Sequence, residues 1–244
     1  IMQATAVNGV LGVAVTFVII AGGIDLAVGT MMTLTAVTAG LVLTNLGLPL
    51  PFGILGALLS GAAMGAVSGV SIAKLKIPPF IATLGMMQIA RGLALVFSGA
   101  KPIYFNSTPS YKYISPESSI TNLIPGLEVP NGVLVMFGVA IVASIILNRT
   151  LFGRYIFALG SNEEAARLSG MNVYFWKIST YALSGMICGV AGLLVSSRLN
   201  SAQPALGLGY ELDAIAAVVI GGTLLTGGTG LAALAFLIPV VAHA

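Results

Sequence analysis

The chain of 244 residues is poor in charge. Lys, Arg, Asp and Glu together make up 7% of it, whereas soluble domains carry roughly 25%. So few charges cannot cover a surface that faces water, so lipid must be the solvent for much of the fold. The net charge of +3 does not indicate nucleic-acid binding, because the basic residues adjoin apolar runs, as in membrane proteins with positive-inside topology. An ordinary soluble domain is therefore excluded.

Residue types that most catalytic sites need are also scarce. The single histidine, His243, stands next to the end of the sequence, so neither a Ser-His-Asp triad nor a histidine-based metal site is expected. The single cysteine, Cys188, lies in an apolar run and is predicted to be a small core residue. No G-x-x-x-x-G-K-[ST] phosphate loop occurs, so this chain is not expected to hydrolyse ATP by that route. The sequence predicts no catalytic residue, metal or cofactor.

Apolar residues and glycine are what the chain has in abundance. Hydrophobic residues account for 57% of the sequence, and 31 residues are glycine. Lipid admits only helices or closed barrels, and no period-2 alternation is present, so the apolar runs predict helices. The predicted fold class is an all-α polytopic transmembrane helix bundle with Gly-rich helix breaks. Its predicted spans are Ala4–Ile20, Thr30–Leu48, Leu50–Ala73, Phe80–Ser98, Val133–Leu147, Ile178–Ser197 and two less regular ones, Ala214–Thr226 and Leu231–Ala242.

Basic residues gather in two loops, 74–76 and 149–177. The positive-inside rule places both on the cytoplasmic side, which requires an even number of crossings between them. Phe80–Ser98 and Val133–Leu147 supply two crossings, so the Lys101–Glu128 loop is predicted to be external. Charge does not fix the orientation of the first two spans.

Glycine marks two interruptions of the apolar pattern, Gly22–Gly29 and Gly221–Gly228. Both are predicted to be breaks between helices. The free backbone groups of such breaks are tolerated only where they line a cavity or pack on protein. Plain Gly-rich turns or helix-packing faces are the alternative, and the residues leave both open.

The polar run 152–173, FGRYIFALGSNEEAARLSGMNV, stands between two long apolar runs. Ser161 or Asn162 can cap a helix whose first turn holds two glutamates that complement the helix dipole. Gly170 suits the end of this helix. Two consecutive alanines leave one side of this helix without large side chains, so that a groove of another protein could close over that side. A short amphipathic helix lying on the membrane surface fits the spacing equally well.

Residues Glu164–Gly170 read EAA, then three further residues, then Gly. This motif resembles the coupling segment of permease subunits in ATP-binding-cassette importers. The whole polar run is similar to the version found in ribose-type monosaccharide permeases. Three further stretches match that family in order: Gly22–Gly29, Pro79–Gly92 and Ser201–Gly228. The resemblance implies a bacterial inner-membrane permease that forms a homodimer, receives sugar from a periplasmic binding protein and docks on a cytoplasmic ATPase.

The resemblance also implies roles for particular residues. Coupling to the ATPase is expected to involve Gly153, Arg154, Gly160, Asn162, Glu164, Ala165, Ala166 and Gly170. Candidates for the substrate pathway are the polar residues of the apolar part: Asp25, Gln88, Arg91, Asn200, Gln203, Glu211 and Asp213.

Several of these candidates have a second interpretation. Asp25 could bond sugar hydroxyls or cap the helix that follows. Arg91 shares a helix face with Gln88 and could line the pathway, although an ion pair with Asp25 or Asp213 is favoured. The four residues from Asn200 onward could bind sugar hydroxyls or belong to a solvated loop that touches the binding protein.

Aromatic residues mark both predicted ends of the bundle. Trp176 is expected to be a membrane-interface anchor rather than a platform for sugar stacking. The aromatic residues of the external loop are candidates for contact with the binding protein: Tyr104, Phe105, Tyr111 and Tyr113.

We expect one transmembrane permease domain over residues 1–244, with its coupling loop at 149–177. The chain opens in apolar sequence, and residues 231–244 do not resemble the usual continuation of the family, so a fragment lacking native terminal parts is expected. An ion-coupled secondary transporter is the alternative, and its ionisable relays would have to be Asp25 and Arg91. A structural membrane scaffold would explain the small residues. Neither alternative gives the EAA helix a role.

Overall fold

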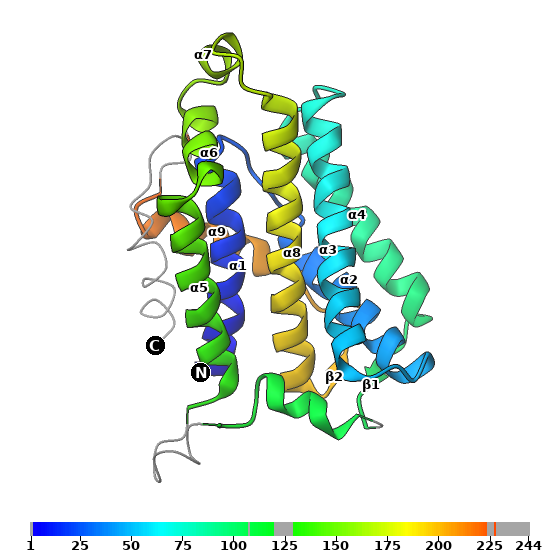
Figure 1. Cartoon of the computed structure of the whole chain (residues 1–244). Coiled ribbons are helices and arrows are strands. Elements are labelled where there is room, and N and C mark those ends of the chain that lie inside the picture. Colours follow the sequence, from blue (N-terminus) through cyan, green and yellow to red (C-terminus); the bar gives the residue numbers. More distant parts are fainter. Residues whose placement is uncertain (1, 107, 120–128, 224–226, 228–244) are drawn as a thin grey trace.

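The computed structural model describes residues 2–106, 108–119, 129–223 and 227, and these form a bundle of long helices (Figure 1). Among the described residues, six helices are long and apolar enough to cross a membrane, which confirms the predicted all-α class. They are α1 (Met2–Ile20), α2 (Val28–Gly40) with its π-helical continuation η1 (Leu41–Asn45), α3 (Leu50–Ala73), α4 (Pro79–Ser98), α5 (Asn131–Arg149) and α8 (Val173–Leu199).

Short elements close the two ends of the bundle. One end carries α6 (Leu151–Ser161) and α7 (Glu163–Leu168). At the other end, β1 (Ile103–Tyr104) and β2 (Ser201–Ala202) pair antiparallel, with Ile103 opposite Ala202, beside the 3-10 helix η2 (Pro109–Ile114). The last described helix, α9 (Tyr210–Ile220), lies within the bundle beside α1 (Figure 1).

The helices differ in how much of their length is buried, which separates central helices from those at the edge. Of the residues in the apolar stretch of α1 that could cross a membrane, 89% are buried, whereas the share is 22% in both α3 and α4. Large apolar side chains are exposed along α4, among them Ile81, Ile89 and Val96, as expected of a helix that faces lipid. Cys188, in contrast, is buried in α8, as predicted.

Glycine allows α3 and α8 to approach closely. A Cβ built on Gly61 would overlap the carbonyl group of Gly185, and a Cβ on Gly185 would overlap that of Gly61. Without side chains at these two positions the backbones come into direct contact, which is the usual role of small residues between membrane helices.

Three predicted boundaries differ from the structure. Helix α8 begins at Val173 rather than Ile178, because the Asn172 side chain caps it by accepting the N–H of Phe175 at 3.1 Å. The second predicted span ends in the π-helical turn η1 instead of reaching Leu48. The predicted span Ala214–Thr226 corresponds to α9, which ends at Ile220. The predicted span Leu231–Ala242 lies outside the described residues.

The ends of the bundle agree with the predicted topology. The connection between α3 and α4, which carries Lys74 and Lys76, lies at the same end as α7 (Figure 1). The described part of the Lys101–Glu128 loop lies at the opposite end with β1 and η2. Helix α1 starts at that opposite end and runs toward α7, which fixes the orientation that charge left open. The chain then turns back into the bundle before α2 (Figure 1).

Candidate functional site

Helix α7 is defined by a cap at each end. The Asn162 side chain accepts the N–H of Ala165 at 2.9 Å, so Asn162 rather than Ser161 is the N-cap. After the helix, Gly170 adopts φ +86°, and the N–H of Met171 bonds the carbonyl of Ala166 at 3.2 Å. This is the Schellman arrangement, which ends a helix sharply and favours glycine. The predicted start and stop signals of this helix are therefore present.

The exposed side of α7 differs from the predicted one. Ala166 is buried and faces the rest of the chain, whereas Ala165 and Glu164 are exposed. Leu168 is 79% exposed, more than any other large apolar residue that the structure describes. Sequence reasoning missed Leu168. The signal was available, because Leu168 is the one large apolar residue between Ser161 and Gly170.

Both glutamates of α7 form ion pairs. The Lys177 ammonium, on α8, lies 2.6 Å from Glu163, and the Arg167 guanidinium lies 2.5 Å from Glu164. The hydrogen bond and charge of Glu164 raise the pKa of the Arg167 guanidinium. Lys177 is only 18% exposed, so its pair with Glu163 is the better shielded from water. It joins α7 to the first turns of α8.

An aromatic cluster fixes α6 to α8. The Trp176 ring lies 5.6 Å from the Phe152 ring and 4.5 Å from the Tyr155 ring, between centroids. Trp176 therefore packs on protein in addition to lying near the α7 end of its span. Gly153 allows the start of α6 to lie against the last turn of α5, because a Cβ there would overlap the carbonyl of Leu147. Arg154, by contrast, is exposed.

The two glycine-marked breaks meet beside α6. A Cβ on Gly227 would lie 2.8 Å from the Cα of Gly22 and 3.1 Å from the carbonyl oxygen of Gly160. Both Gly22 and Gly227 have positive φ, +78° and +79°. Gly22 and Gly23 also line a cavity of about 220 Å³ that reaches Lys177. The first break thus lines a cavity, and the described part of the second packs against the first.

Asp25, inside the first break, is fully buried against α8. Its carboxylate accepts the N–H of Ala27 at 2.9 Å and the hydroxyl of Ser184 at 3.4 Å. The Tyr181 hydroxyl donates to the carbonyl of Ile24 at 3.4 Å. Asp25 therefore holds the backbone just before α2, while the N-cap of that helix is Ala27.

Gln88 and Arg91 lie on a side of α4 that the rest of the described chain does not fully cover. The buried side of α4 carries Thr83, Met86, Ala90 and Ala94, whereas Gln88 is exposed and Arg91 half-buried. Arg91 makes no ion pair with any residue that the structure describes. The predicted pair with Asp25 or Asp213 is therefore wrong, since Asp25 is satisfied by Ala27 and Ser184.

The four polar residues after α8 differ in their partners and in their burial. Asn200 ends α8 in the left-handed conformation, φ +50°, and Gln203 bonds the Ser201 hydroxyl at 3.4 Å. Glu211 is buried and accepts the N–H of Gly209 at 3.1 Å, whereas Asp213 is exposed on α9. Their role in the substrate pathway stays a prediction.

Within the described residues, the six helices that could cross a membrane and the short capped helix at one end of the bundle define a class, the multi-pass membrane protein. The chain belongs to the family described as Branched-chain amino acid transport system / permease component, whose model matches residues 1–241. It is thus a permease component of the bacterial inner membrane.

Curated relatives carry more specific names. The chain is 45% identical to the ribose import permease protein RbsC of Haemophilus influenzae, covering 94% of this chain and 70% of that protein. Identity to RbsC of Escherichia coli is 43%, with the same coverage. Identity to the Escherichia coli xylose transport system permease XylH is 35%, covering 94% of this chain and 72% of that one. A search of solved structures found no match.

Proposed function

We propose that this chain is the membrane-spanning subunit of an ATP-driven importer of a monosaccharide, with ribose as the first candidate. The observation that carries the proposal is α7, a helix capped at both ends that presents Glu164, Ala165 and Leu168 to solvent. The names of the relatives support a sugar rather than an amino acid.

A separate ATPase subunit binds α7 from the cytoplasm in this proposal. Leu168 enters an apolar groove of the ATPase, and the small side chain of Ala165 allows the walls of that groove to approach the helix closely. Ala166 and Gly170 act indirectly, by packing and by ending the helix. Gly153 and Gly160 let α6 lie against its neighbours, so a movement of α7 reaches the bundle.

The sugar pathway runs along the open side of α4, between two copies of this chain. An arginine at membrane depth costs about 2.5–3.5 kcal/mol on insertion scales. Arg91 is half-buried and has no ion pair among the described residues, so it requires water or another protein. Gln88 is exposed one turn away. Asp25 and Glu211 support the pathway indirectly, because each accepts a backbone N–H. Asn200, Gln203 and Asp213 lie near the external entrance of the pathway in this proposal.

An ion-coupled secondary transporter is the second candidate, because Asp25 is a buried carboxylate. It is less well supported. The Asp25 carboxylate is bound to a backbone N–H and a hydroxyl rather than to a chain of ionisable groups, and α7 would have no task.

Uptake by proteoliposomes tests the choice of solute. The chain is reconstituted with a candidate ATPase and a candidate solute-binding protein, and uptake of labelled ribose, xylose and leucine is compared. We expect ATP-dependent uptake of a monosaccharide, ribose first, and none of leucine. Uptake of leucine alone would contradict the proposal.

A further inference from the structure

Two arginines, Arg149 and Arg154, flank the corner where α5 passes into α6. Arg149 lies in the last turn of α5, and Arg154 lies at the end of the first turn of α6. Both are exposed, and neither guanidinium makes an ion pair with a residue that the structure describes. The acidic residues nearest to them in sequence, Glu163 and Glu164, are already paired with other cations. None of the proposed steps of transport uses this pair of arginines.

The corner that carries the two arginines is held in place by Thr150. Its hydroxyl donates to the carbonyl of Ile146, in α5, at 2.6 Å and accepts the N–H of Gly153, in α6, at 3.5 Å. The backbone of Gly153 also lies directly against the carbonyl of Leu147. The last turn of α5 and the first turn of α6 are therefore in contact, which keeps the two arginines on neighbouring turns.

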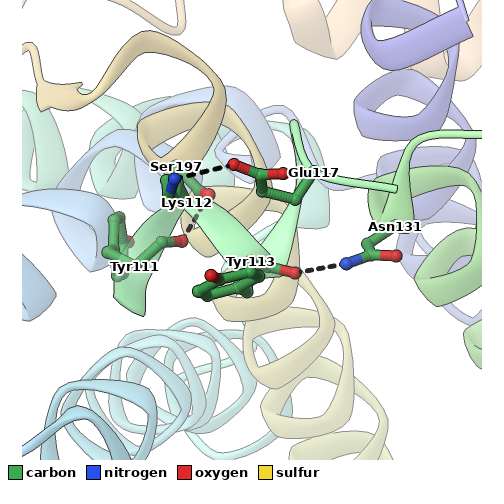
Figure 2. Close-up of polar contacts among 6 residues, drawn as sticks. All are labelled: Tyr111, Lys112, Tyr113, Glu117, Asn131 and Ser197. Atoms are coloured by element: carbon green, nitrogen blue, oxygen red, sulfur yellow. Dashed lines mark hydrogen bonds and ion pairs between the residues drawn. The ribbon is translucent and has the colours of Figure 1, made fainter. Parts of the chain in front are cut away.

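Helix α5 sets the depth of this corner in the membrane. At its external end, the Asn131 amide donates to the carbonyl of Tyr113 at 2.7 Å (Figure 2). The 19 residues from Asn131 to Arg149 span about 28 Å at about 1.5 Å per residue, close to the roughly 30 Å of a hydrocarbon core. Arg149 therefore lies at the level of the cytoplasmic headgroups. Next to the corner are Tyr155 and Trp176, whose ring centroids lie 4.5 Å apart, and membrane interfaces favour these two residue types.

On the membrane side of the arginines, α5 presents apolar side chains to lipid. Val142 is 56% exposed and Ile145 is 52% exposed. Val142 precedes Arg149 by two helical turns, which places both on one face of the helix. This face is apolar along the membrane and positively charged at its cytoplasmic end. Its pattern is complementary to a lipid with apolar chains and an anionic headgroup.

We infer that the corner formed by Arg149 and Arg154 binds an anionic phospholipid of the cytoplasmic leaflet, with the two guanidinium groups on its phosphate oxygens. A guanidinium meets a phosphate with two parallel hydrogen bonds, and anionic lipids attract basic residues that adjoin a span. A zwitterionic lipid is a poorer match, because its own cation cancels the charge that two unpaired arginines attract. An acidic surface of the ATPase is a poorer match too, because the apolar face next to Arg149 lies in lipid. A lipid held here contacts α6, which leads directly to α7.

Trp176, the single tryptophan of the sequence, reports on the lipid at this corner. The chain is reconstituted in mixtures of phosphatidylcholine and phosphatidylglycerol, and one of the two lipids carries bromine on its acyl chains, which quenches tryptophan fluorescence on contact. The quenching curves give the binding constant of phosphatidylglycerol relative to phosphatidylcholine. We expect a preference of about tenfold for phosphatidylglycerol, because two cations at the membrane surface attract an anionic headgroup.

Three double variants locate the preference. Arg149→Gln with Arg154→Gln should reduce it to about twofold or less. Arg149→Lys with Arg154→Lys keeps the charge without the planar fork and should lie between this variant and the wild type. Lys74→Gln with Lys76→Gln is the matched control, since it removes two exposed cations at the same end of the bundle, and it should keep the full preference.

The outcomes decide the inference by themselves. Equal quenching by the two lipids in the wild type would overturn it, and so would an equal loss of preference in the lysine control, because the attraction would then be general to the cytoplasmic surface. Absence of a lipid preference together with loss of ATPase co-purification in the glutamine variant would assign the corner to the ATPase instead. Should the glutamine variant fail to fold, full preference in the Arg→Lys variant would still exclude a role for the fork. The quenching measurement needs neither ATP nor sugar, so the inference can fail while the proposed function stands.

Discussion

The Lys177 ammonium lies 2.6 Å from the Glu163 carboxylate, and this pair connects the solvent-exposed helix α7 with α8. Farther along α8, Tyr181 and Ser184 bind Ile24 and Asp25 in the first helix break. One rigid helix thus contacts both the proposed docking segment and the break inside the bundle. A force applied to α7 has a direct route to the backbone before α2.

Reversing this pair should separate coupling from stability. Glu163→Lys leaves two cations facing each other, and we expect ATP turnover in the presence of sugar-loaded binding protein to fall several-fold. Stability should change by less than about 1 kcal/mol, since Glu163 is half exposed. The double variant Glu163→Lys with Lys177→Glu should recover most of the turnover. Equal loss in the single and double variants would show that the pair does not carry the coupling.

Leu168 should be essential for docking although it supports no packing. Leu168→Glu is expected to abolish co-purification with the ATPase, because a charge cannot enter an apolar groove without a large desolvation cost. Leu46→Glu is the matched control, since Leu46 is 67% exposed and stands at the opposite end, between η1 and α3. ATPase retention by Leu168→Glu would remove Leu168 from the docking surface.

The contact between α3 and α8 should be intolerant of a single methyl group. Gly185→Ala places a Cβ against the carbonyl of Gly61, and overpacking of this kind costs about 1–3 kcal/mol. Gly138→Ala on α5 has open space around its Cβ and should stabilise by up to about 1 kcal/mol through lower backbone entropy in the unfolded state. Thermal unfolding in detergent measures both. A similar midpoint for the two variants would mean that the helices do not touch as described.

Asp25 should tolerate amide substitution better than truncation. Asp25→Asn keeps an acceptor for the N–H of Ala27 and a group that can bond Ser184. Asp25→Ala leaves a buried N–H without an acceptor, at a cost of about 1–3 kcal/mol. We therefore expect a lower unfolding temperature for the alanine variant and a nearly unchanged one for the asparagine variant. A strongly destabilised asparagine variant would indicate that the negative charge itself is required.

Much of the fold could be predicted because the constraint of lipid is simple. Long apolar runs in a chain with few charges leave helices as the available structure, and basic loops gave the relative sides of two connections. Boundaries were less accurate where a side chain decided them, as Asn172 does for α8. The span at Leu231–Ala242, the limits of the domain and the expected fragment stay predictions.

The candidate sites were predictable to different degrees. The caps of α7 follow local rules, so the sequence predicted Gly170 at its end and either Ser161 or Asn162 at its start, and the structure selects Asn162. The unpaired state of Arg91 within the described residues could not be predicted, because ion pairing depends on which helix faces are adjacent. Long-range contacts of this kind leave no periodic signal.

The driving force of transport tests the central claim most directly. Proteoliposomes containing the chain, its ATPase and its loaded binding protein are given either ATP on the ATPase side or an inward proton or sodium gradient without ATP. The account predicts accumulation of labelled sugar with ATP and none with the gradients, and loss of the ATP-driven uptake in Leu168→Glu. Accumulation driven by an ion gradient in vesicles without the ATPase would contradict it.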